Sequence, residues 1–510
     1  MNNLKKRISL CLMVVILGLG APLFSQVFKE ADLPNIIVFL VDDMGLMDTS
    51  VPFIFGEDGN PIKYPFNDYY RTPNMEKLAG QGIRFSNFYA HSVCSPTRSS
   101  IMTGQNSARH GTTNWIKSEN NNRTEFGPSD WNWEGLTKKA ITLPRVLHQK
   151  GYRTIHVGKA HFAPFDHEGE DPTNLGFDVE IAGSSIGQPG SYYGKDGFGH
   201  IQGNKSRAVP GLEKYWNKDI FLTEALTLEA NAAISRSEQD GKPFYLYMSH
   251  YAVHAPFQSD PRFADHYKES GMSEKAQAYA TLIEGIDKSL GDIIAHVKSL
   301  GLGQNTLIFF LGDNGSDAPM EIMDDYSSSV PLKGKKGNNW EGGMRIPFIA
   351  SWITPNEQSS MQKVLHIQKG AVQSQMGSIL DLFPTIANLV NISYPKSHIL
   401  DGFDLKKQLE GNKNRKRQNV FLNHFPHEHR SSYFTSLVKD DWKAIYHYQI
   451  KGKPRYELFN LKMDPFETTD LAGTKPKELK RMIKNLSNRL KNEGALYPEK
   501  DGKSLKVIIP

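Results

Sequence analysis

The sequence predicts an α/β protein in which helices cover a central, mostly parallel β-sheet. Five apolar runs rich in β-branched and aromatic residues recur along the chain, and such runs are typical of strands that are buried on both faces of a parallel sheet. Segments with helical periodicity lie between them, and this alternation favours a layered α/β sandwich. The predicted strands are residues 35–41, 152–158, 244–250, 306–312 and 346–352.

The first 25 residues have the layout of a secretory signal peptide. A basic start, KKR, precedes an apolar stretch at residues 8–19, and small or polar residues follow near Ser25. The apolar stretch is shorter than the ~20 residues that a membrane-spanning helix requires. We therefore expect residues 1–25 to be a signal peptide, the chain to be periplasmic or secreted, and no stable membrane anchor to be present.

The composition is that of a globular protein with a large core. Of its 510 residues, 39% are hydrophobic and 23% are charged, which excludes a disordered or fibrous chain. Removal of the signal peptide takes away three positive charges, so the formal charge falls from +5 to about +2. Nucleic-acid binding usually requires a concentrated basic face, and we therefore expect no nucleic-acid partner.

One helix and one long loop region stand out between the predicted strands. Residues 273–300 place apolar side chains at steps of three and four, which is the period of an amphipathic helix, and Gly301 is a suitable stop. Residues 126–215 are rich in Gly, Trp and Tyr and show weak periodicity. Long loops are often functional, so we expect this region to frame a site.

The pattern changes after the basic run at residues 412–419, which we interpret as a solvated linker. Beyond it, the sequence alternates like strands with one exposed face, and a helix is predicted at residues 476–490. These features predict a small antiparallel sheet with one helix. We therefore divide the mature chain into a large domain at residues 26–419 and a C-terminal subdomain at residues 420–510.

Oxygen-bearing side chains follow two of the predicted strands. Asp42 and Asp43 end the first strand, and Asp313 and Asn314 follow the fourth. Open α/β sheets bind ligands beyond the carboxyl ends of their strands, so these groups would share one rim. Adjacent carboxylates repel each other unless a cation lies between them, and oxygen donors favour Ca²⁺ or Mg²⁺. The pattern predicts a site for a hard cation rather than loop or helix caps.

Once the first 25 residues are removed, Cys94 is the only cysteine. It therefore has no partner for an internal disulfide in an oxidising compartment. Pro96 stiffens the following turn, and Arg98 places a fixed positive charge nearby. The thiol is then either an activated nucleophile or a small buried hydrophobic group, and the residues around it leave both interpretations open.

The sequence around Cys94 resembles a known family signature. Residues 92–104, SVCSPTRSSIMTG, are similar to the first signature of the formylglycine-dependent sulfatases, in which the cysteine is oxidised to an aldehyde before folding. A second signature is similar to GYRTIHVGKAH at residues 151–161, and the resemblance spans residues 35 to about 475. The other matching segments, in the family's order, are DDMG, TPNMEKLAGQGIRF, HYAVHAPF, GDNG, KKGNNWEGGMRIP, DDWKAIYHY and YELFNLKMDPFETTDLA.

The chain is identified as a member of this family, which implies an alkaline-phosphatase-like α/β/α sandwich with a mixed, mostly parallel central sheet. The resemblance implies that residues 26–419 form the sulfatase catalytic domain. It also implies one Ca²⁺ per chain, held by a formylglycine at position 94 and by the oxygen-bearing residues that follow the two strands. The implied ligands are Asp42, Asp43, Cys94 in its modified form, Asp313 and Asn314.

The resemblance also assigns roles around the nucleophile. Arg98 and Lys159 would stabilise the hydrated aldehyde, and His161 would manage its proton. Lys336 and His254 would contact the sulfate and the leaving group. A charge-neutralising set of this kind suits a sulfate ester, whose negative oxygens repel an incoming nucleophile.

Some residues stay ambiguous in the sequence. Ala160 stands where the family usually has an aromatic residue, which affects packing more than chemistry. The family's serine contact to sulfate fits either Ser184 or Ser185. His427 and His429 lie at the predicted domain junction and are candidates for substrate contact, although a structural role is the default. Structural roles are also the simpler interpretation for His250, Trp115, Trp131 and Trp133.

The resemblance implies a sulfuric ester hydrolase that acts through formylglycine. Export and the aromatic loops favour a sulfated polysaccharide or oligosaccharide, with algal polysaccharides such as ulvan or carrageenan and animal glycosaminoglycans as examples. A formylglycine-generating enzyme would be the maturation partner. Two alternatives stay open at this point: a phosphomonoester or phosphonate ester hydrolase of the same superfamily, and a non-catalytic protein that binds sulfated glycans and keeps its thiol.

Overall fold

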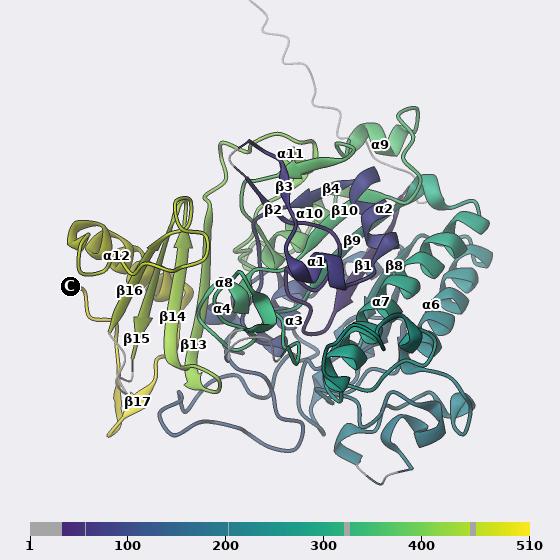
Figure 1. Ribbon diagram of the computed structural model, residues 1–510, viewed down its shortest axis with the longest axis horizontal. Helices are drawn as coiled ribbons and strands as arrows, with labels where there is room; N and C mark the ends of the chain where they lie inside the picture. Colours follow the sequence, from purple (N-terminus) through teal and green to yellow (C-terminus); the bar gives the residue numbers. More distant parts are fainter. Residues whose placement is uncertain (1–32, 57, 202, 204, 321–326, 449–454) are drawn as a thin grey trace, which may run out of the picture.

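The computed structural model describes residues 33–56, 58–201, 203, 205–320, 327–448 and 455–510 (Figure 1). The predicted signal peptide at residues 1–25 lies outside these ranges. No helix within them is long and apolar enough to cross a bilayer. In Figure 1 an α/β sandwich lies on the right, and a smaller antiparallel sheet with one helix lies on the left.

The centre of the sandwich is an eight-stranded sheet. In chain order its strands are β1 (Asn35–Val41), β4 (Ile83–Phe85), β6 (Arg153–Gly158), β7 (Val179–Ile181), β8 (Phe244–Ser249), β9 (Thr306–Gly312), β10 (Phe348–Trp352) and β11 (Ala371–Gln373). Their order across the sheet is β11-β4-β10-β9-β1-β8-β6-β7. The five predicted runs therefore all form strands of this one sheet.

The sheet is mixed because one strand, β10, runs antiparallel to both of its neighbours, β9 and β4. The other neighbouring pairs are parallel. The predicted mixed, mostly parallel sheet is therefore confirmed, and among the five predicted runs residues 346–352 form the antiparallel strand. A parallel return requires a crossover, usually through a helix, whereas the described part of the β9–β10 connection contains no helix longer than α8 (Glu341–Met344).

Helices cover both faces of the sheet, which confirms the predicted α/β/α layers. Alternate residues of β1 point to opposite faces, so Ile37 and Phe39 pack with one layer and Ile36 and Val38 pack with the other. All of them are fully buried. One layer contains α2 (Pro73–Gln81), α6 (Leu222–Gln239) and α7 (Glu274–Ser299), and the other contains α3 (Cys94–Thr103), α5 (Leu143–Gln149) and α10 (Leu382–Leu389).

The helix predicted at residues 273–300 is confirmed as α7. Ser273 caps its first turn, because the Ser273 side chain accepts a hydrogen bond from the backbone N–H of Ala276. Gly301 follows the helix with a φ of +76°, in the left-handed region that favours glycine. Both ends of the helix are therefore set by local residues.

The remaining elements are short and belong mainly to the loops around the sheet. The described part of residues 126–215 contains α5, β6 and β7, together with short 3₁₀ segments, turns and bends. The short helices and strands are α1 (Pro65–Tyr69), α4 (Ser107–His110), α9 (Ser360–Val364), α11 (Lys406–Leu409), β2 (Ile54–Phe55), β3 (Pro61–Ile62), β5 (Phe88–Tyr89), β12 (Gly377–Ser378), β17 (Glu499–Lys500) and β18 (Lys503–Ser504). The 3₁₀ segments are η2 (Glu168–Glu170), η3 (Pro172–Leu175), η4 (Gly194–Gly199), η5 (Lys205–Arg207), η6 (Glu213–Tyr215), η7 (Ala264–His266), η8 (Gly303–Asn305), η9 (Ser327–Ser329) and η10 (Ile379–Asp381).

The C-terminal sheet is buried on both faces. It consists of β13 (Val420–Glu428), β14 (Ser432–Lys439), β15 (Trp442–His447) and β16 (Tyr456–Asn460), which pair antiparallel in this order. The helix α12 (Pro476–Glu493) packs on one face. On the other face, Phe434 and Ile445 pack with Val93 and Trp340 of the sandwich. The expectation of an exposed face is therefore wrong, because this alternating pattern belongs to a sheet covered on both sides.

A buried ion-pair network also joins the C-terminal sheet to the sandwich. The Lys443 Nζ atom, on β15, lies 3.0 Å from Glu341 Oε1 and 2.8 Å from Glu467 Oε1. The hydroxyl of Tyr89 donates to Glu341 Oε2 at 2.9 Å. Burial raises the pKa of Glu467 to about 7, although Lys443 opposes the change. The network fixes β15 against α8.

Candidate active site

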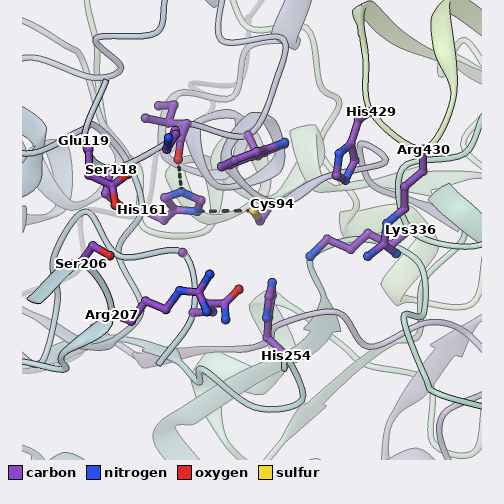
Figure 2. Close-up of a pocket in the computed structure, with 15 residues that line it drawn as sticks. Cys94, Ser118, Glu119, His161, Ser206, Arg207, His254, Lys336, His429 and Arg430 are labelled. Carbon is purple, nitrogen blue, oxygen red and sulfur yellow. Dashed lines mark hydrogen bonds between the residues drawn. The ribbon is translucent and has the colours of Figure 1, made fainter. Parts of the chain in front are cut away.

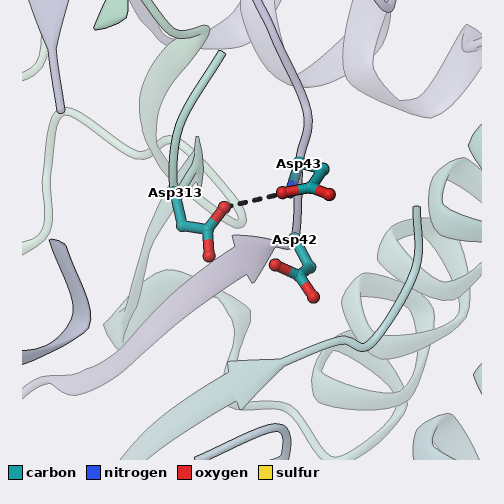
Figure 3. Close-up of side chains that lie close together, drawn as sticks. All are labelled: Asp42, Asp43 and Asp313. Atoms are coloured by element: carbon teal, nitrogen blue, oxygen red, sulfur yellow. Dashed lines mark hydrogen bonds between the residues drawn. The ribbon is translucent and has the colours of Figure 1, made fainter. Parts of the chain in front are cut away.

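The strand order brings the predicted oxygen ligands together. Asp42 and Asp43 follow β1, and Asp313 and Asn314 follow β9, which is hydrogen-bonded to β1 in parallel. Carboxylate oxygens of Asp42, Asp43 and Asp313 all lie within 4.8 Å of one another (Figure 3). The backbone N–H of Asp43 donates to Asp313 Oδ1 at 3.0 Å. All three carboxylates are buried at the predicted rim.

Asn314 completes this set of oxygen-bearing side chains. Its Nδ2 atom donates to Asp43 Oδ1 at 2.9 Å, whereas its Oδ1 atom is buried and has no hydrogen-bond partner among the described residues. A buried acceptor without a donor is costly, and a cation would satisfy it. Carboxylate and amide oxygens are the donors that Ca²⁺ and Mg²⁺ prefer, so the residues present fit a hard cation.

Three buried cations pair with the three carboxylates. Lys159 Nζ donates to both oxygens of Asp42, at 2.9 and 2.7 Å. Lys336 Nζ lies 2.7 Å from Asp43 Oδ1 and 2.8 Å from Asp43 Oδ2. The Arg98 guanidinium lies 3.0 and 2.8 Å from Asp313 Oδ2 through its Nε and Nη2 atoms. Each predicted cationic residue is therefore present at the site, held by a predicted ligand.

The pKa values in the cluster show how closely its charges are packed. Burial raises the pKa of Asp42 and, with the neighbouring charge of Asp42, raises that of Asp313 to about 6 despite Arg98. Burial acts in the same direction on Asp43, but Lys336 and His254 outweigh it and hold the pKa of Asp43 below its usual range. A divalent cation among these oxygens would favour the ionised form of all three groups.

Cys94 is the first residue of α3, a helix whose ten residues are all buried. Only 3% of Cys94 is exposed. Its Sγ atom lies 3.4 Å from His161 Nδ1. Arg98, one turn further along the same helix, contacts the carboxylate of Asp313. It also donates to the carbonyl oxygen of Lys159 at 2.9 Å. The helix therefore positions the thiol and the guanidinium together.

The hydrogen bonds of His161 fix which of its ring nitrogens carries the proton. Its Nε2 atom lies 2.6 Å from the carbonyl oxygen of Ile116, and a carbonyl can only accept, so Nε2 is protonated. Nδ1 then carries the lone pair, and it lies 3.4 Å from both Cys94 Sγ and Ser95 Oγ. Burial, together with Lys159, lowers the pKa of His161 well below its usual range. The imidazole is thus neutral and faces Cys94 with its basic nitrogen.

Gly187 makes room for the His161 ring. A Cβ atom added to Gly187 would lie 3.0 Å from His161 Cε1 and 3.2 Å from Nε2, which is too close without a shift of the ring. His161 itself has a φ of +56°, and its backbone N–H donates to the carbonyl oxygen of Ser184 at 3.0 Å. The ring is therefore oriented by the loop that contains Ser184 and Gly187.

His254 lies opposite His161, in the loop after β8. Its Nδ1 atom is 3.0 Å from the carbonyl oxygen of Ala255, so Nδ1 carries the proton in the neutral ring. Its Nε2 atom is 3.6 Å from Asp43 Oδ2. Burial and Lys336 lower the pKa of His254 to about 3. The Nε2 atom must therefore gain a proton before it can act as an acid.

A pocket of about 300 Å³ opens above Cys94 (Figure 2). Of the six residues predicted as catalytic, Cys94, His161, His254 and Lys336 line it, whereas Arg98 and Lys159 lie buried behind it. Figure 2 shows His161 and Arg207 on one side of Cys94 and Lys336, His429 and Arg430 on the other. The remaining lining residues are Trp115, Ile116, Lys117, Ser118, Glu119, Gly187, Gln188 and Ser206.

The structure separates the ambiguous histidines and serines. His429 lines the pocket, but His427 is buried next to Trp131 and shares a hydrogen bond of 2.9 Å with Thr113. His250 is buried against Phe39 in the core. Neither Ser184 nor Ser185 lines the pocket. The described structure therefore favours His429 over these four residues for substrate contact.

Several lining residues are absent from the sequence-based prediction. Lys117, Glu119, Gln188 and Arg430 lie on irregular segments, and Arg207 ends the short 3₁₀ segment η5, so no periodicity indicates the direction of these side chains. Among the three tryptophans, Trp115 lines the pocket, whereas Trp131 is buried and Trp133 packs against His167. A structural role is therefore supported for two of the three.

The buried residue Ala160 stands between Lys159 and His161. It belongs to the same apolar cluster as Phe162. Ala160 is therefore accommodated by packing, and the neighbouring Lys159 and His161 are both at the candidate site.

Family models and relatives match most of the chain. A model described as Sulfatase matches residues 34–392, and one described as N-sulphoglucosamine sulphohydrolase, C-terminal, matches residues 339–495. Arylsulfatase J of Mus musculus is 27% identical over 92% of this chain and 78% of that protein. N-acetylgalactosamine-6-sulfatase of Mus musculus is 31% identical over 73% of this chain, which spans 65% of that protein.

Solved structures share the fold over nearly the whole chain. The structure of Ps i-CgsB in complex with k-i-k-neocarrahexaose has a TM-score of 0.70 and 23% identity, and the match covers 92% of this chain and 95% of that one. A sulfatase from Pseudoalteromonas sp. has a TM-score of 0.66 and 23% identity, with 92% of each chain covered. At these identities the likeness is one of fold.

Proposed function

This chain belongs to the sulfatase family of sulfuric ester hydrolases, and we propose that it hydrolyses sulfate esters of a sulfated carbohydrate after export, through a formylglycine made from Cys94. The observation that supports this most is the contact between Cys94 Sγ and His161 Nδ1 at 3.4 Å, at the base of the pocket. A sulfated polysaccharide or oligosaccharide, such as carrageenan, ulvan or a glycosaminoglycan, is the proposed substrate. The relatives' names and the carrageenan oligosaccharide bound to Ps i-CgsB support this class.

The chemistry at position 94 needs a nucleophile, a base and charge neutralisation. A formylglycine there would supply, as its hydrate, a hydroxyl able to displace the sugar oxygen from sulfur, which breaks the S–O bond of the ester. His161 Nδ1 faces this position and accepts a proton from it. Lys336, across the pocket, neutralises sulfate oxygens, and His254 donates a proton to the leaving oxygen once its Nε2 atom is protonated.

We assign one Ca²⁺ to the oxygen cluster. Asp42, Asp43, Asp313 and Asn314, with the modified residue 94, would hold it, and the ion supplies positive charge next to the reacting oxygens. The buried Oδ1 atom of Asn314 supports this assignment. Arg98 donates to Asp313 and Lys159 donates to Asp42. In this proposal the two cations therefore position metal ligands as well as add positive charge.

Modification of Cys94 requires a partner that acts before folding. All ten residues of α3 are buried, so another enzyme has no access to the thiol in the folded chain. A formylglycine-generating enzyme that acts on the unfolded, exported or nascent chain is therefore the proposed partner.

Matched aryl esters test the reaction class. We expect kcat/KM for 4-methylumbelliferyl sulfate to exceed that for 4-methylumbelliferyl phosphate, because the chain belongs to the sulfatase family. Steady-state assays of protein with the modified residue 94 measure both. A preference for phosphate above about a hundredfold would overturn the proposal in favour of a phosphomonoester or phosphonate ester hydrolase.

Asp313→Asn is expected to weaken Ca²⁺ binding by about 100-fold, because a ligand charge is lost while the shape and an acceptor for Arg98 are kept. Isothermal titration of chelator-treated protein with Ca²⁺ measures the change. Asp265→Ala, at an exposed surface pair with Lys268, is the control and is expected to bind Ca²⁺ like the unchanged protein. An unaltered affinity in Asp313→Asn would contradict the ligand assignment.

A further inference from the structure

The cationic side chains that line the pocket are of two kinds: some are paired with an acidic residue, and some are not. Lys336 is paired with Asp43, and Arg430 is paired with Asp317, which accepts hydrogen bonds from both terminal nitrogens of the guanidinium. Lys117 and Arg207 also line the pocket. Neither has an ion-pair or hydrogen-bond partner for its side chain among the described residues. Within the described part of the chain, two cations of this pocket are therefore left without a counter-charge.

Arg207 is placed to reach a bound molecule. It is exposed, at the end of η5, and Figure 2 shows its side chain entering the pocket between His161 and His254, on the side opposite Lys336. Lys117 is half-buried and follows Ile116, whose carbonyl oxygen orients His161. The two cations thus border the space next to the reacting groups without belonging to the buried cluster.

The acidic residues near these cations do not neutralise them. Glu119 is the one acidic side chain among the described lining residues, and it is exposed and forms no ion pair with either cation. Asp43 and Asp317 are engaged with Lys336 and Arg430. Unpaired cations in a concave site attract anions, and an arginine can bind a carboxylate or sulfate through two parallel hydrogen bonds.

We propose that Arg207 and Lys117 bind a second anionic group of the substrate, a carboxylate or a second sulfate, on the sugar that carries the scissile sulfate or on its neighbour. This inference rests on the proposed function, because it places the scissile sulfate over Cys94. The pocket of about 300 Å³ is at the small end for ligand sites, so a second anion within it lies close to the first. The preferred substrate is therefore a dianionic unit of an acidic glycan.

Binding to a non-reacting variant tests this without turnover. In full-length Cys94→Ala, isothermal titration compares a κ-carrageenan disaccharide with one sulfate, an ι-carrageenan disaccharide with two, and a chondroitin 6-sulfate disaccharide with one sulfate and one uronate. We expect at least one dianionic disaccharide to bind about tenfold to a hundredfold more tightly than the monosulfated one. The ι-carrageenan and chondroitin arms tell whether sulfate or carboxylate is preferred.

The same titrations are then repeated with Arg207→Gln and Lys117→Gln added. We expect each to reduce the advantage of the dianionic disaccharide, and the pair to remove it. Arg415→Gln, at an exposed arginine outside the pocket, is the matched control and is expected to keep the advantage. Equal affinity for mono- and dianionic disaccharides, or an equal loss for both in the variants, would overturn the proposal.

The two proposals fail in different ways. If 4-methylumbelliferyl sulfate is not hydrolysed by the modified protein, the proposed function fails, while a dianion preference in Cys94→Ala still supports the anion site. If hydrolysis is normal and the preference is absent, only the anion site is overturned. Thermal unfolding of each variant, expected to match the parent because Lys117 and Arg207 lack protein partners among the described residues, excludes a folding defect.

Discussion

Replacing Cys94 with alanine is expected to lower sulfate ester hydrolysis by about 10⁴-fold or more, because loss of a covalent nucleophile leaves only binding and electrostatic contributions. The fold is expected to persist. The change removes only what is attached to Cβ of residue 94, in a helix that stays buried, and the midpoint of thermal unfolding is expected to fall by only a few degrees. Steady-state kinetics and calorimetry of the same preparation measure both quantities.

A matched control separates chemistry from packing. Ser99 lies in the same helix, and its buried Oγ atom has no hydrogen-bond partner among the described residues, so Ser99→Ala also removes one atom from α3. It is expected to keep its activity. Mass spectrometry of the peptide with residue 94 from active, native-host protein is expected to show a loss of about 18 Da, from thiol to aldehyde. An intact thiol in fully active protein would contradict the formylglycine mechanism, and an intact thiol in native-host protein that does not hydrolyse sulfate esters would favour a binding protein.

Replacing Lys443 with methionine is expected to lower the free energy of unfolding by about 3–5 kcal/mol, because a buried charge network loses its cation. The Lys443 Nζ atom lies 3.0 Å from Glu341 and 2.8 Å from Glu467, and all three side chains are almost completely buried. Without the lysine, two carboxylates face each other away from water. Urea unfolding monitored by fluorescence measures the loss.

Two further variants show whether the charge itself is responsible. Lys480→Met, on the exposed face of α12, is expected to change the free energy of unfolding by less than about 0.5 kcal/mol. Combining Lys443→Met with Glu341→Gln and Glu467→Gln removes the carboxylate repulsion and is expected to recover part of the stability. A loss below about 1 kcal/mol in Lys443→Met would show that the network does not hold the sheet in place.

Regular structure was the predictable part of this molecule. Every residue of β1 is buried, so the strand appears in the sequence as an uninterrupted apolar run. Asp42 and Asp313 meet because neighbouring parallel strands end at the same edge. The direction of β10 was not predictable, because an apolar run looks the same for a parallel and an antiparallel strand. The direction is determined by the connection between β9 and β10.

The pocket walls were harder to predict because they lie on irregular backbone. His427 and His429 are two residues apart, and a strand would place them on the same side. However, the pairing of β13 shifts between Phe425 and Glu428, and the strand ends there. His427 therefore packs inward against Trp131, and His429 enters the pocket. Lys117 and Arg207 carry no periodic signal either.

The hairpin between β13 and β14 determines whether the sandwich can form the complete pocket without the C-terminal sheet. Cys94 and His161 come from the sandwich, but His429 and Arg430 come from this hairpin of the C-terminal sheet. A chain cut after residue 392, where the matched Sulfatase segment ends, would lack one side of the pocket and the Lys443 contact that holds it. The proposed active site is therefore built from both parts of the chain, and a fragment designed to retain it must include the C-terminal sheet.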